Sequence, residues 1–401
     1  MKDLRISPPV MVLVFGCLLL AINMGVRQTM GLFVEPMTAA HGWSREAFSF
    51  AIGLQNLLWG ASQPFAAAIA ERYGVARTLL IGATLYALGL LLMAQSESVL
   101  ALNLSAGMLV GLGISGTAFP IVFGAVARTV SAERRSLALG LAGAGASFGQ
   151  FIFTPFTQFI IDDSGWFIAL MVLAAFCAAM VPMSRALKGR TNANGNEAQT
   201  LGAALVEARG HSGYLFLTVG FFVCGFQVVF IAVHIIPYVT QLNMSPMIGA
   251  SALGLVGLFN IFGSLGAGAL GGRYRKKHLL SYLYLTRSAV ILVFILGPKT
   301  EISVLIFGAI IGLLWLSTVP LTSALIAQIF GPRYLGTLFG ITFFSHQVGS
   351  FLGAWLGGLV FDMTGSYNLM WQATIVLGVV AAALHWPIRD APVVRLATSK
   401  V

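Results

Sequence analysis

The chain has very little charge. Only 9% of its 401 residues are Asp, Glu, Lys or Arg, whereas 58% are hydrophobic. Soluble domains carry about 25% charged residues, so this composition excludes a soluble fold of this size. Apolar runs long enough to cross a bilayer as helices recur along the sequence, and the short alternating segments of a β-barrel are absent. The sequence therefore predicts an all-α membrane protein.

Cysteine and catalytic motifs are also scarce. The three cysteines, Cys17, Cys177 and Cys224, lie inside apolar runs without metal-site or disulfide spacing. We interpret them as small packing residues. No phosphate-binding loop with its Lys-Ser/Thr pair and no buried Ser/His/Asp set appears. The sequence therefore predicts neither an enzyme nor a protein that needs a cofactor or metal.

Twelve apolar runs are predicted to be transmembrane helices. They cover residues 8–34, 47–70, 77–96, 99–127, 136–161, 166–186, 213–240, 247–271, 279–297, 302–330, 335–361 and 367–388. A polar segment separates the sixth run from the seventh. We predict a six-helix bundle at 1–186, a cytoplasmic linker at 187–212 and a second six-helix bundle at 213–401.

The two halves of the chain repeat one another. At an offset of about 200 residues, Gly53 matches Gly254, Arg72 matches Arg273, and Asp162 matches Asp362. Two similar bundles of this kind are typical of transporters in which one half rocks against the other around a central site. The twelve helices are therefore expected to form two pseudo-symmetric bundles.

The positive charges predict the orientation. Most of the 23 lysines and arginines fall in one set of loops, while Arg45 and Lys299 lie on the opposite side. By the positive-inside rule both termini are cytoplasmic, and the expected location is the inner (plasma) membrane. The net charge of +10 then reflects membrane topology and contact with anionic lipid, and nucleic acid is not an expected partner.

The loop after the second run resembles the signature of the major facilitator superfamily. The first copy reads Ala67-x-x-x-Glu71-Arg72-Tyr73-Gly74, and the repeat copy reads Gly268-x-x-x-Gly272-Arg273. This resemblance implies the major facilitator fold and a cytoplasmic gate in which Glu71, Arg72 and Arg273 pair across the halves in the outward-open state. The alternative is that these are ordinary cytoplasmic charges.

The first run resembles the monocarboxylate transporter branch, which includes oxalate–formate exchangers. The resemblance rests on Asn23-Met-Gly25-Val-Arg27-Gln28, with Pro36 and Gly42-Trp43-Ser44-Arg45 beyond it. Mammalian members carry an Asp and Arg pair in the eighth span, where this chain has only Asn260. The resemblance implies a monomeric carrier of small organic anions that works with protons or a counter-anion.

Arg27 is the predicted substrate-binding residue. A guanidinium can grip a carboxylate with two hydrogen bonds, and a charge inside a span usually faces a cavity. All 13 acidic residues lie in loops or at span ends, so an anionic substrate is its expected counter-ion. Asn23, one turn earlier, and Gln28 are expected beside it. The alternative is an arginine that extends to the outer headgroups.

Further polar residues lie in spans expected to line the cavity. The predicted substrate-binding set also contains Asn56, Gln150, Gln227, His234, Asn260, His346 and Gln347. Each could instead link two helices. His234 is a candidate proton carrier because imidazole titrates near neutral pH, and Glu35 at the mouth of the first span is the other. Arg287 in the ninth span is expected to pack against a neighbour or to extend toward the cytoplasm, and would clamp a dicarboxylate if it faced the cavity.

The predicted function is secondary active transport of a small carboxylate by alternating access, with proton symport or anion exchange. Two alternatives remain open. One is export of neutral or amphipathic metabolites or drugs, although the lack of a buried carboxylate disfavours cationic drugs. The other is a membrane sensor that does not transport.

Overall fold

The computed structural model describes residues 8–187, 200–331 and 334–393, without the side chains of Pro8, Glu71, Ala132, Glu133, Arg135 and Ser136. The described residues form helices and no strand. The N-terminal half contains α1 (Pro8–Gln28), η1 (Thr29–Phe33), α2 (Val34–His41), α3 (Arg45–Tyr73), α4 (Val75–Ala94), α5 (Val99–Leu102), η2 (Asn103–Leu109), α6 (Val110–Thr117), α7 (Phe119–Thr129), α8 (Ala132–Met183) and η3 (Ser184–Leu187). The C-terminal half contains α9 (Leu201–Gly210), α10 (Ser212–Gln241), α11 (Pro246–Arg273), α12 (Lys276–Leu296), α13 (Glu301–Leu314), α14 (Thr318–Phe330), α15 (Leu335–Thr364) and α16 (Asn368–His385).

The helices follow the predicted spans closely. α8 covers the fifth and sixth spans together, and the predicted break between them lies at Gly165, where φ is 86° and ψ is 165°. Only glycine adopts this backbone conformation without strain, so the chain can turn there although the hydrogen-bond pattern runs on. The predicted linker contains α9, and residues 188–199 lie outside the described part.

Within the described residues, nine helices are long and apolar enough to cross a membrane. One of the nine, at 137–187, contains two predicted spans. The interrupted first, fourth and tenth spans are each counted as one. α3 and α15 are not among the nine, and both carry several buried amides and hydroxyls. The all-helical membrane fold is confirmed, and twelve crossings remain a prediction consistent with it.

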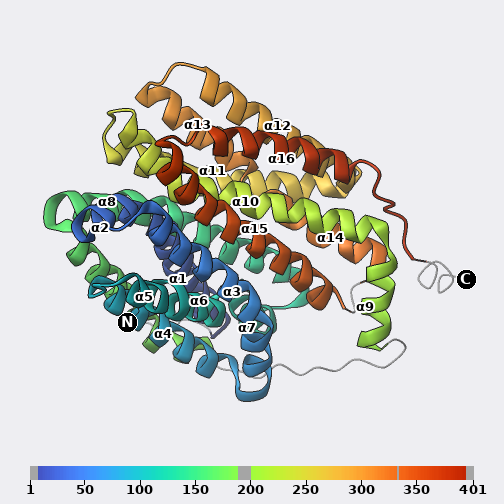
Figure 1. The fold of residues 1–401 in the computed structure, drawn as a ribbon. Helices are drawn as coiled ribbons and strands as arrows, with labels where there is room; N and C mark the ends of the chain where they lie inside the picture. Colours follow the sequence, from blue (N-terminus) through green and yellow to red (C-terminus); the bar gives the residue numbers. More distant parts are fainter. Residues whose placement is uncertain (1–7, 188–199, 332–333, 394–401) are drawn as a thin grey trace, which may run out of the picture.

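The helices form two groups that follow the order of the chain. In Figure 1 the blue-to-green helices of the first half lie together, and the yellow-to-red helices of the second half lie beside them. α1 packs on α8 and α4 packs on α6 and α8, whereas α10 packs on α15 and α12 packs on α16. We call these groups the N-terminal bundle and the C-terminal bundle.

Two helix pairs form the most extensive contacts between the bundles, and the sequence repeat relates these pairs. α3 packs on α15, and α8 packs on α11. A Cβ built on Gly53 would lie 2.9 Å from Phe351, and one built on Gly254 would lie 3.1 Å from the carbonyl oxygen of Phe151. Because Gly53 and Gly254 are equivalent in the repeat, as are Phe351 and Phe151, the repeated residues form equivalent contacts in both pairs.

The bundles meet at one end and part at the other. Contacts between them extend from Asp362, which accepts hydrogen bonds from the start of α3, to Phe343 against Trp59 at a ring separation of 5.3 Å. Nearer the other end, the repeat-related Gly140 and Gly340 have open space beside them. We call these the closed end and the open end. In the expected orientation the open end faces the cytoplasm.

Candidate functional site between the two bundles

The first span changes its helical geometry at the middle of the molecule. α1 ends at Gln28 and continues as the five-residue 3-10 helix η1, in which the Thr29 hydroxyl donates to the Val26 carbonyl at 2.8 Å. A Cβ on Gly31 would lie 2.5 Å from the carbonyl oxygen of Ala232 in α10. Glycine therefore permits the two bundles to touch here. A 3-10 stretch inside a longer helix often marks a functional hinge.

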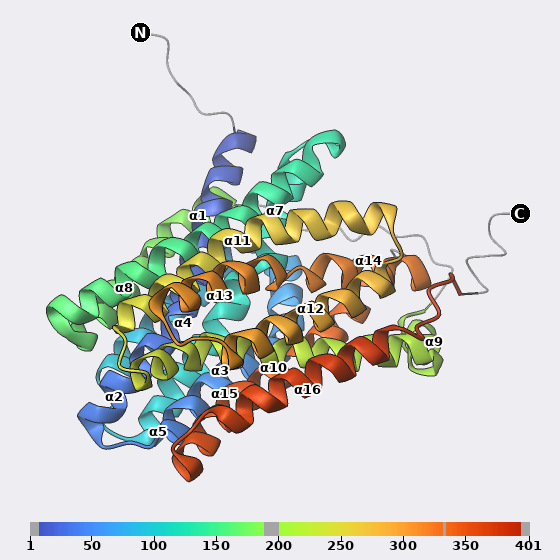
Figure 2. The ribbon, with the colours of Figure 1, turned by 90° about the horizontal axis from the view of Figure 1, so that it is seen from above.

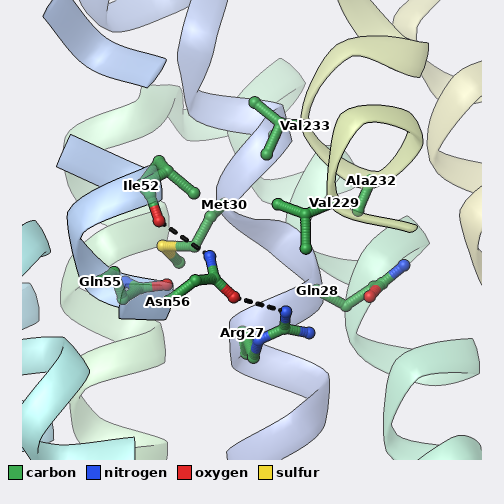
Figure 3. A pocket seen from close by; sticks show the side chains of 10 residues that line it. Arg27, Gln28, Met30, Ile52, Gln55, Asn56, Val229, Ala232 and Val233 are labelled. Carbon is green, nitrogen blue, oxygen red and sulfur yellow. Dashed lines mark hydrogen bonds between the residues drawn. The ribbon is translucent and has the colours of Figure 1, made fainter. Parts of the chain in front are cut away.

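A small cavity lies beside this change of geometry, between the two bundles (Figure 3). Its free volume is about 10 Å³, which is close to the space of a single water molecule. α1, η1 and α3 form one wall, and α10 forms the other. The lining residues are Arg27, Gln28, Met30, Gly31, Ile52, Gln55, Asn56, Val229, Ala232 and Val233.

Arg27 supplies the positive charge of this cavity. Its Nη2 donates to Asn56 Oδ1 at 2.7 Å, and its guanidinium carbon lies 4.9 Å from the centre of the Trp59 ring. Asn56 is itself oriented by donating to the Ile52 carbonyl at 2.8 Å. Arg27 Nε is buried without a hydrogen-bond partner, and no carboxylate is among the lining residues. The guanidinium therefore retains donors for an anion.

Two glutamines add further unsatisfied polar groups. Both amide atoms of Gln28 are buried without a partner, and so is Oε1 of Gln55. Gln55 Nε2 donates at 3.0 Å to the Ala106 carbonyl, which lies in the π-helical segment η2. Buried polar groups without partners cost free energy, so a polar ligand would be stabilised here. Gln55 and Trp59 were not predicted from the sequence, although Gln55 adjoins Asn56.

Two predicted binding residues instead link helices within one bundle. Asn23 Nδ2 donates to the Thr117 hydroxyl at 2.5 Å, inside the N-terminal bundle. Gln227 Nε2 donates to the Thr374 carbonyl at 2.9 Å, inside the C-terminal bundle. Neither residue lines the cavity.

The two histidines of the predicted set face the interior of the C-terminal bundle. His234 is fully buried, and its Nε2 lies 2.8 Å from the Ala354 carbonyl in α15. His346 Nδ1 lies 3.0 Å from Oε1 of the neighbouring Gln347, and its ring stacks on Phe343. Neither ring is among the residues that line the cavity.

The remaining predicted binding residues lie at the contacts between the bundles. Asn260 donates to the Ser147 hydroxyl at 3.0 Å, and a Cβ on Gly257 would approach Gln150 to 2.7 Å. A Cβ on Gly60 would lie 2.6 Å from the side chain of Gln347. These residues therefore occupy the two helix pairs that join the bundles, on either side of the cavity.

Arg287 is buried in the C-terminal bundle and does not reach the cavity. Its guanidinium donates to Gln227 Oε1 at 3.1 Å, to the Trp315 carbonyl at 2.9 Å and to the Leu314 carbonyl. Leu314 ends α13, and α14 begins at Thr318. Arg287 therefore packs against a break in the tenth span. Of the two expected positions, this is the one in which it packs against a neighbouring helix.

The predicted gating residue Arg72 and the proton-coupling candidate Glu35 lie at opposite ends of α3. Arg72 at the open end places its guanidinium carbon 5.3 Å from the Tyr73 ring, and Arg273 is exposed. The side chain of Glu71 is outside the described part. At the closed end, Glu35 forms an ion pair of 2.9 Å with Arg45. The pairing of Glu71, Arg72 and Arg273 across the bundles therefore stays a prediction.

The family model for the Major Facilitator Superfamily matches residues 13–354. The chain belongs to the Major Facilitator Superfamily. Members of this superfamily are transporters, so the prediction of a transporter and not an enzyme is confirmed.

Relatives in the superfamily cover most of the chain. An uncharacterized MFS-type transporter, YcxA of Bacillus subtilis, is 27% identical over 371 residues, covering 90% of both chains. Monocarboxylate transporter 13 of Bos taurus is 25% identical over 351 residues, covering 87% of this chain and 82% of its own. The solved structure of a variant of the nucleoside transporter NupG superposes with a TM-score of 0.77 at 12% identity, covering 95% and 100% of the two chains. The expected resemblance to monocarboxylate transporters is thereby confirmed.

Proposed function

We propose that this superfamily member is a secondary active transporter of small organic anions, and that monocarboxylates are its substrate class. The observation that carries the proposal is Arg27. It is a guanidinium between the two bundles with an unpartnered Nε and no carboxylate among its neighbours in the cavity. The likeness to a protein named as a monocarboxylate transporter supports the same substrate class.

The shape and chemistry of the cavity favour a small substrate with one carboxylate. Arg27 and Asn56 form a polar corner, while Ile52, Val229 and Val233 provide apolar walls. A carboxylate at Arg27 would place a short carbon chain against these walls. The other intramembrane arginine, Arg287, donates to carbonyls inside its own bundle. One available cation suits a monocarboxylate better than a dicarboxylate.

The conformation supports transport by alternating access. The cavity has room for about one water molecule, so the bundles must part further at this level before a substrate can enter. Gly31 touches α10 across the cavity, and rocking of the bundles would separate this contact. Anion binding would then couple to the motion because both bundles line the site. The accompanying ion is a proton or a counter-anion.

Uptake into proteoliposomes tests the proposal. A panel of radiolabelled monocarboxylates, dicarboxylates and neutral analogues is offered to the purified protein. We expect saturable monocarboxylate uptake that Arg27→Ala reduces at least tenfold and Arg27→Lys restores in part, because Lys keeps the charge without the planar donor pair. Arg209→Ala, an exposed arginine on α9, is the matched control.

The other outcomes separate the alternatives. Normal monocarboxylate uptake by Arg27→Ala would contradict the proposal. Transport of neutral compounds alone would favour an exporter of neutral or amphipathic metabolites, and tight binding without transport would favour a sensor. His234→Gln tests proton coupling, since an unchanged pH dependence of uptake would assign the coupling elsewhere.

A further inference from the structure

A second, larger space lies on the surface of the C-terminal bundle, away from Arg27. It is a groove of about 280 Å³ between α11, α12 and the broken tenth span. These helices run side by side in Figure 2. The lining residues are Phe262, Gly263, Gly266, Ala267, Leu270, Leu279, Tyr282, Leu283, Thr286, Leu313, Ser317 and Leu321.

The groove is apolar and opens toward the bilayer. Phe262, Leu270 and Tyr282 on its rim are 59%, 45% and 55% exposed. The lining residues all belong to the C-terminal bundle, so the groove does not open into the space between the bundles, and we take the exposure to be to lipid. Gly266 in its wall has no atom within 4 Å of a built Cβ. Water does not fill a space with so few polar partners. Within a membrane, the apolar matter available to fill it is a hydrocarbon chain.

Positive charge adjoins one end of the groove. Arg273 ends α11, three residues beyond Leu270, and Lys276 begins α12, three residues before Leu279. The Lys276 side chain passes within 4.0 Å of the Cβ position of Gly271, which also contacts the groove residue Leu321. The stem of Lys276 is therefore continuous with the groove wall.

The balance of charge at this turn is positive. Asp390 pairs with Arg275 at 2.6 Å, and Lys277 donates to the Ile388 carbonyl at 2.9 Å. Lys276 donates to the neutral Gln328 at 2.8 Å, and Arg273 is exposed. Among the described residues of this turn, Arg273, Arg275, Lys276 and Lys277 are cations, and Asp390 pairs with one of them, Arg275. Clusters of Lys and Arg beside membrane helices attract anionic headgroups.

We propose that this groove is a binding site for an anionic phospholipid. An acyl chain occupies the space between α11 and α12, and the phosphate lies beside Arg273 and Lys276. The apolar lining selects a chain, and the adjoining cations select a negatively charged head. The site is independent of substrate binding at Arg27.

Native mass spectrometry of the full-length protein, titrated with phosphatidylglycerol or phosphatidylcholine, tests the site. We expect the wild type to retain phosphatidylglycerol preferentially. Gly266→Leu should abolish this retention, because the new side chain fills the groove where nothing obstructs it. Gly340→Leu on α15 is the matched control, since Gly340 also has open space beside it. Equal retention by Gly266→Leu and wild type would overturn the proposal.

The headgroup contribution has its own variant. Arg273→Gln combined with Lys276→Gln should weaken the preference for phosphatidylglycerol over phosphatidylcholine by about 20- to 30-fold, since each basic residue near an anionic surface contributes about fivefold. Equal retention of the two lipids by the wild type, or an unchanged preference in the double variant, would overturn the anionic assignment.

A measurement on the wild-type protein alone tests the site without relying on variants that could fail to fold. Phosphatidylglycerol with a photoreactive acyl chain is reconstituted with the protein, illuminated, and the labelled peptides are mapped. We expect labelling of the segments containing Phe262–Leu270 and Leu279–Leu283. Labelling spread evenly over all membrane-facing helices would show an ordinary lipid annulus and would contradict a defined site.

Discussion

At the scale of single residues, Arg27 decides what the cavity can bind. Its neighbours Asn56 and Trp59 orient the guanidinium without neutralising it, because an amide and an aromatic ring carry no negative charge. An unpaired charge inside the membrane costs free energy, and these contacts hold the guanidinium in position without removing that cost. A bound carboxylate would remove that cost, and this is the physical basis for the proposed specificity.

Asn56→Asp should therefore weaken substrate binding, because the new Asp carboxylate would compete with the substrate for Arg27. The new side chain would pair with Arg27, and a substrate would have to break a charge-assisted interaction of about 1.5–3 kcal/mol. We expect the KM for monocarboxylate uptake to rise about tenfold or more. Gln95→Glu, which adds the same charge at an exposed position, should leave KM unchanged. An unaltered KM in Asn56→Asp would place the substrate elsewhere.

At the scale of helices, the tenth span is built around a break held by a buried arginine. Between α13 and α14 the backbone loses regular hydrogen bonds, and Arg287 satisfies the carbonyls of Leu314 and Trp315. Asn260 accepts from the Leu316 amide at 3.1 Å and also donates to Ser147 in the other bundle. The break is thus connected to the contact between α8 and α11.

Arg287→Ala is expected to destabilise the C-terminal bundle. It would leave two carbonyls and the Gln227 amide without a buried donor, at a cost of about 3 kcal/mol or more, since each unsatisfied group costs about 1–3 kcal/mol. The midpoint of thermal unfolding in detergent should fall by several degrees, whereas Arg209→Ala should leave it in place. An unchanged midpoint would mean that Arg287 is not a structural element of the break.

At the scale of the whole molecule, carboxylates join the two bundles at the closed end: Glu46 accepts a hydrogen bond of 3.1 Å from the Trp355 indole, and Asp362 caps α3. Asp362 at the end of α15 accepts hydrogen bonds from the amides of Arg45 at 3.2 Å and Glu46 at 2.6 Å, in the first turn of α3. A carboxylate at a helix N-terminus is favourable. Arg45 adds a hydrogen bond of 2.8 Å to Tyr367. The C-terminal bundle therefore caps a helix of the N-terminal bundle.

Asp362→Asn should shift the conformational equilibrium toward the state that opens at this end. Asn keeps one acceptor oxygen but loses the charge and the acceptor for the second amide. A hydrogen bond to a charged group is worth about 1.5–3 kcal/mol, so that population should rise about tenfold or more. Spin labels at Ala40 and Asn243, both exposed at the closed end, in a background without the native cysteines, would report a longer distance by electron paramagnetic resonance.

The sequence repeat supplies a control variant for the contact between Asp362 and the first turn of α3. Asp162 is equivalent to Asp362, yet it accepts a hydrogen bond of 2.7 Å from Gln158 one turn earlier in its own helix. The matching helix α11 starts with Pro246, which has no amide hydrogen to donate. Asp162→Asn should leave the distance distribution unchanged. Equal shifts in both variants would show that Asp362 has no special role.

Much of the fold followed from hydrophobicity and glycine positions. The apolar runs predicted the helices because the backbone N–H and C=O groups of a membrane span must form hydrogen bonds within the span. The break at Gly165 coincides with the predicted gap between two runs. α3 and α15 carry polar residues that face the other bundle. This explains why these two helices are less hydrophobic than the nine that are apolar enough to cross a membrane. The gate at Glu71, Arg72 and Arg273 stays a prediction for the opposite conformation.

The sequence by itself determined an all-helical transporter of two related halves, with Arg27 as a rare charge in an apolar span, because charge and hydrophobic length carry that information locally. Only the tertiary structure decided which polar residues share a space. Asn23, Gln227 and His234 lie in suitable spans, but their side chains bond within one bundle. Gln55 instead lines the cavity with Arg27, and the Trp59 ring lies beside the guanidinium. Helix rotation and the approach of two bundles determine such neighbours, and both depend on packing between residues far apart in the chain.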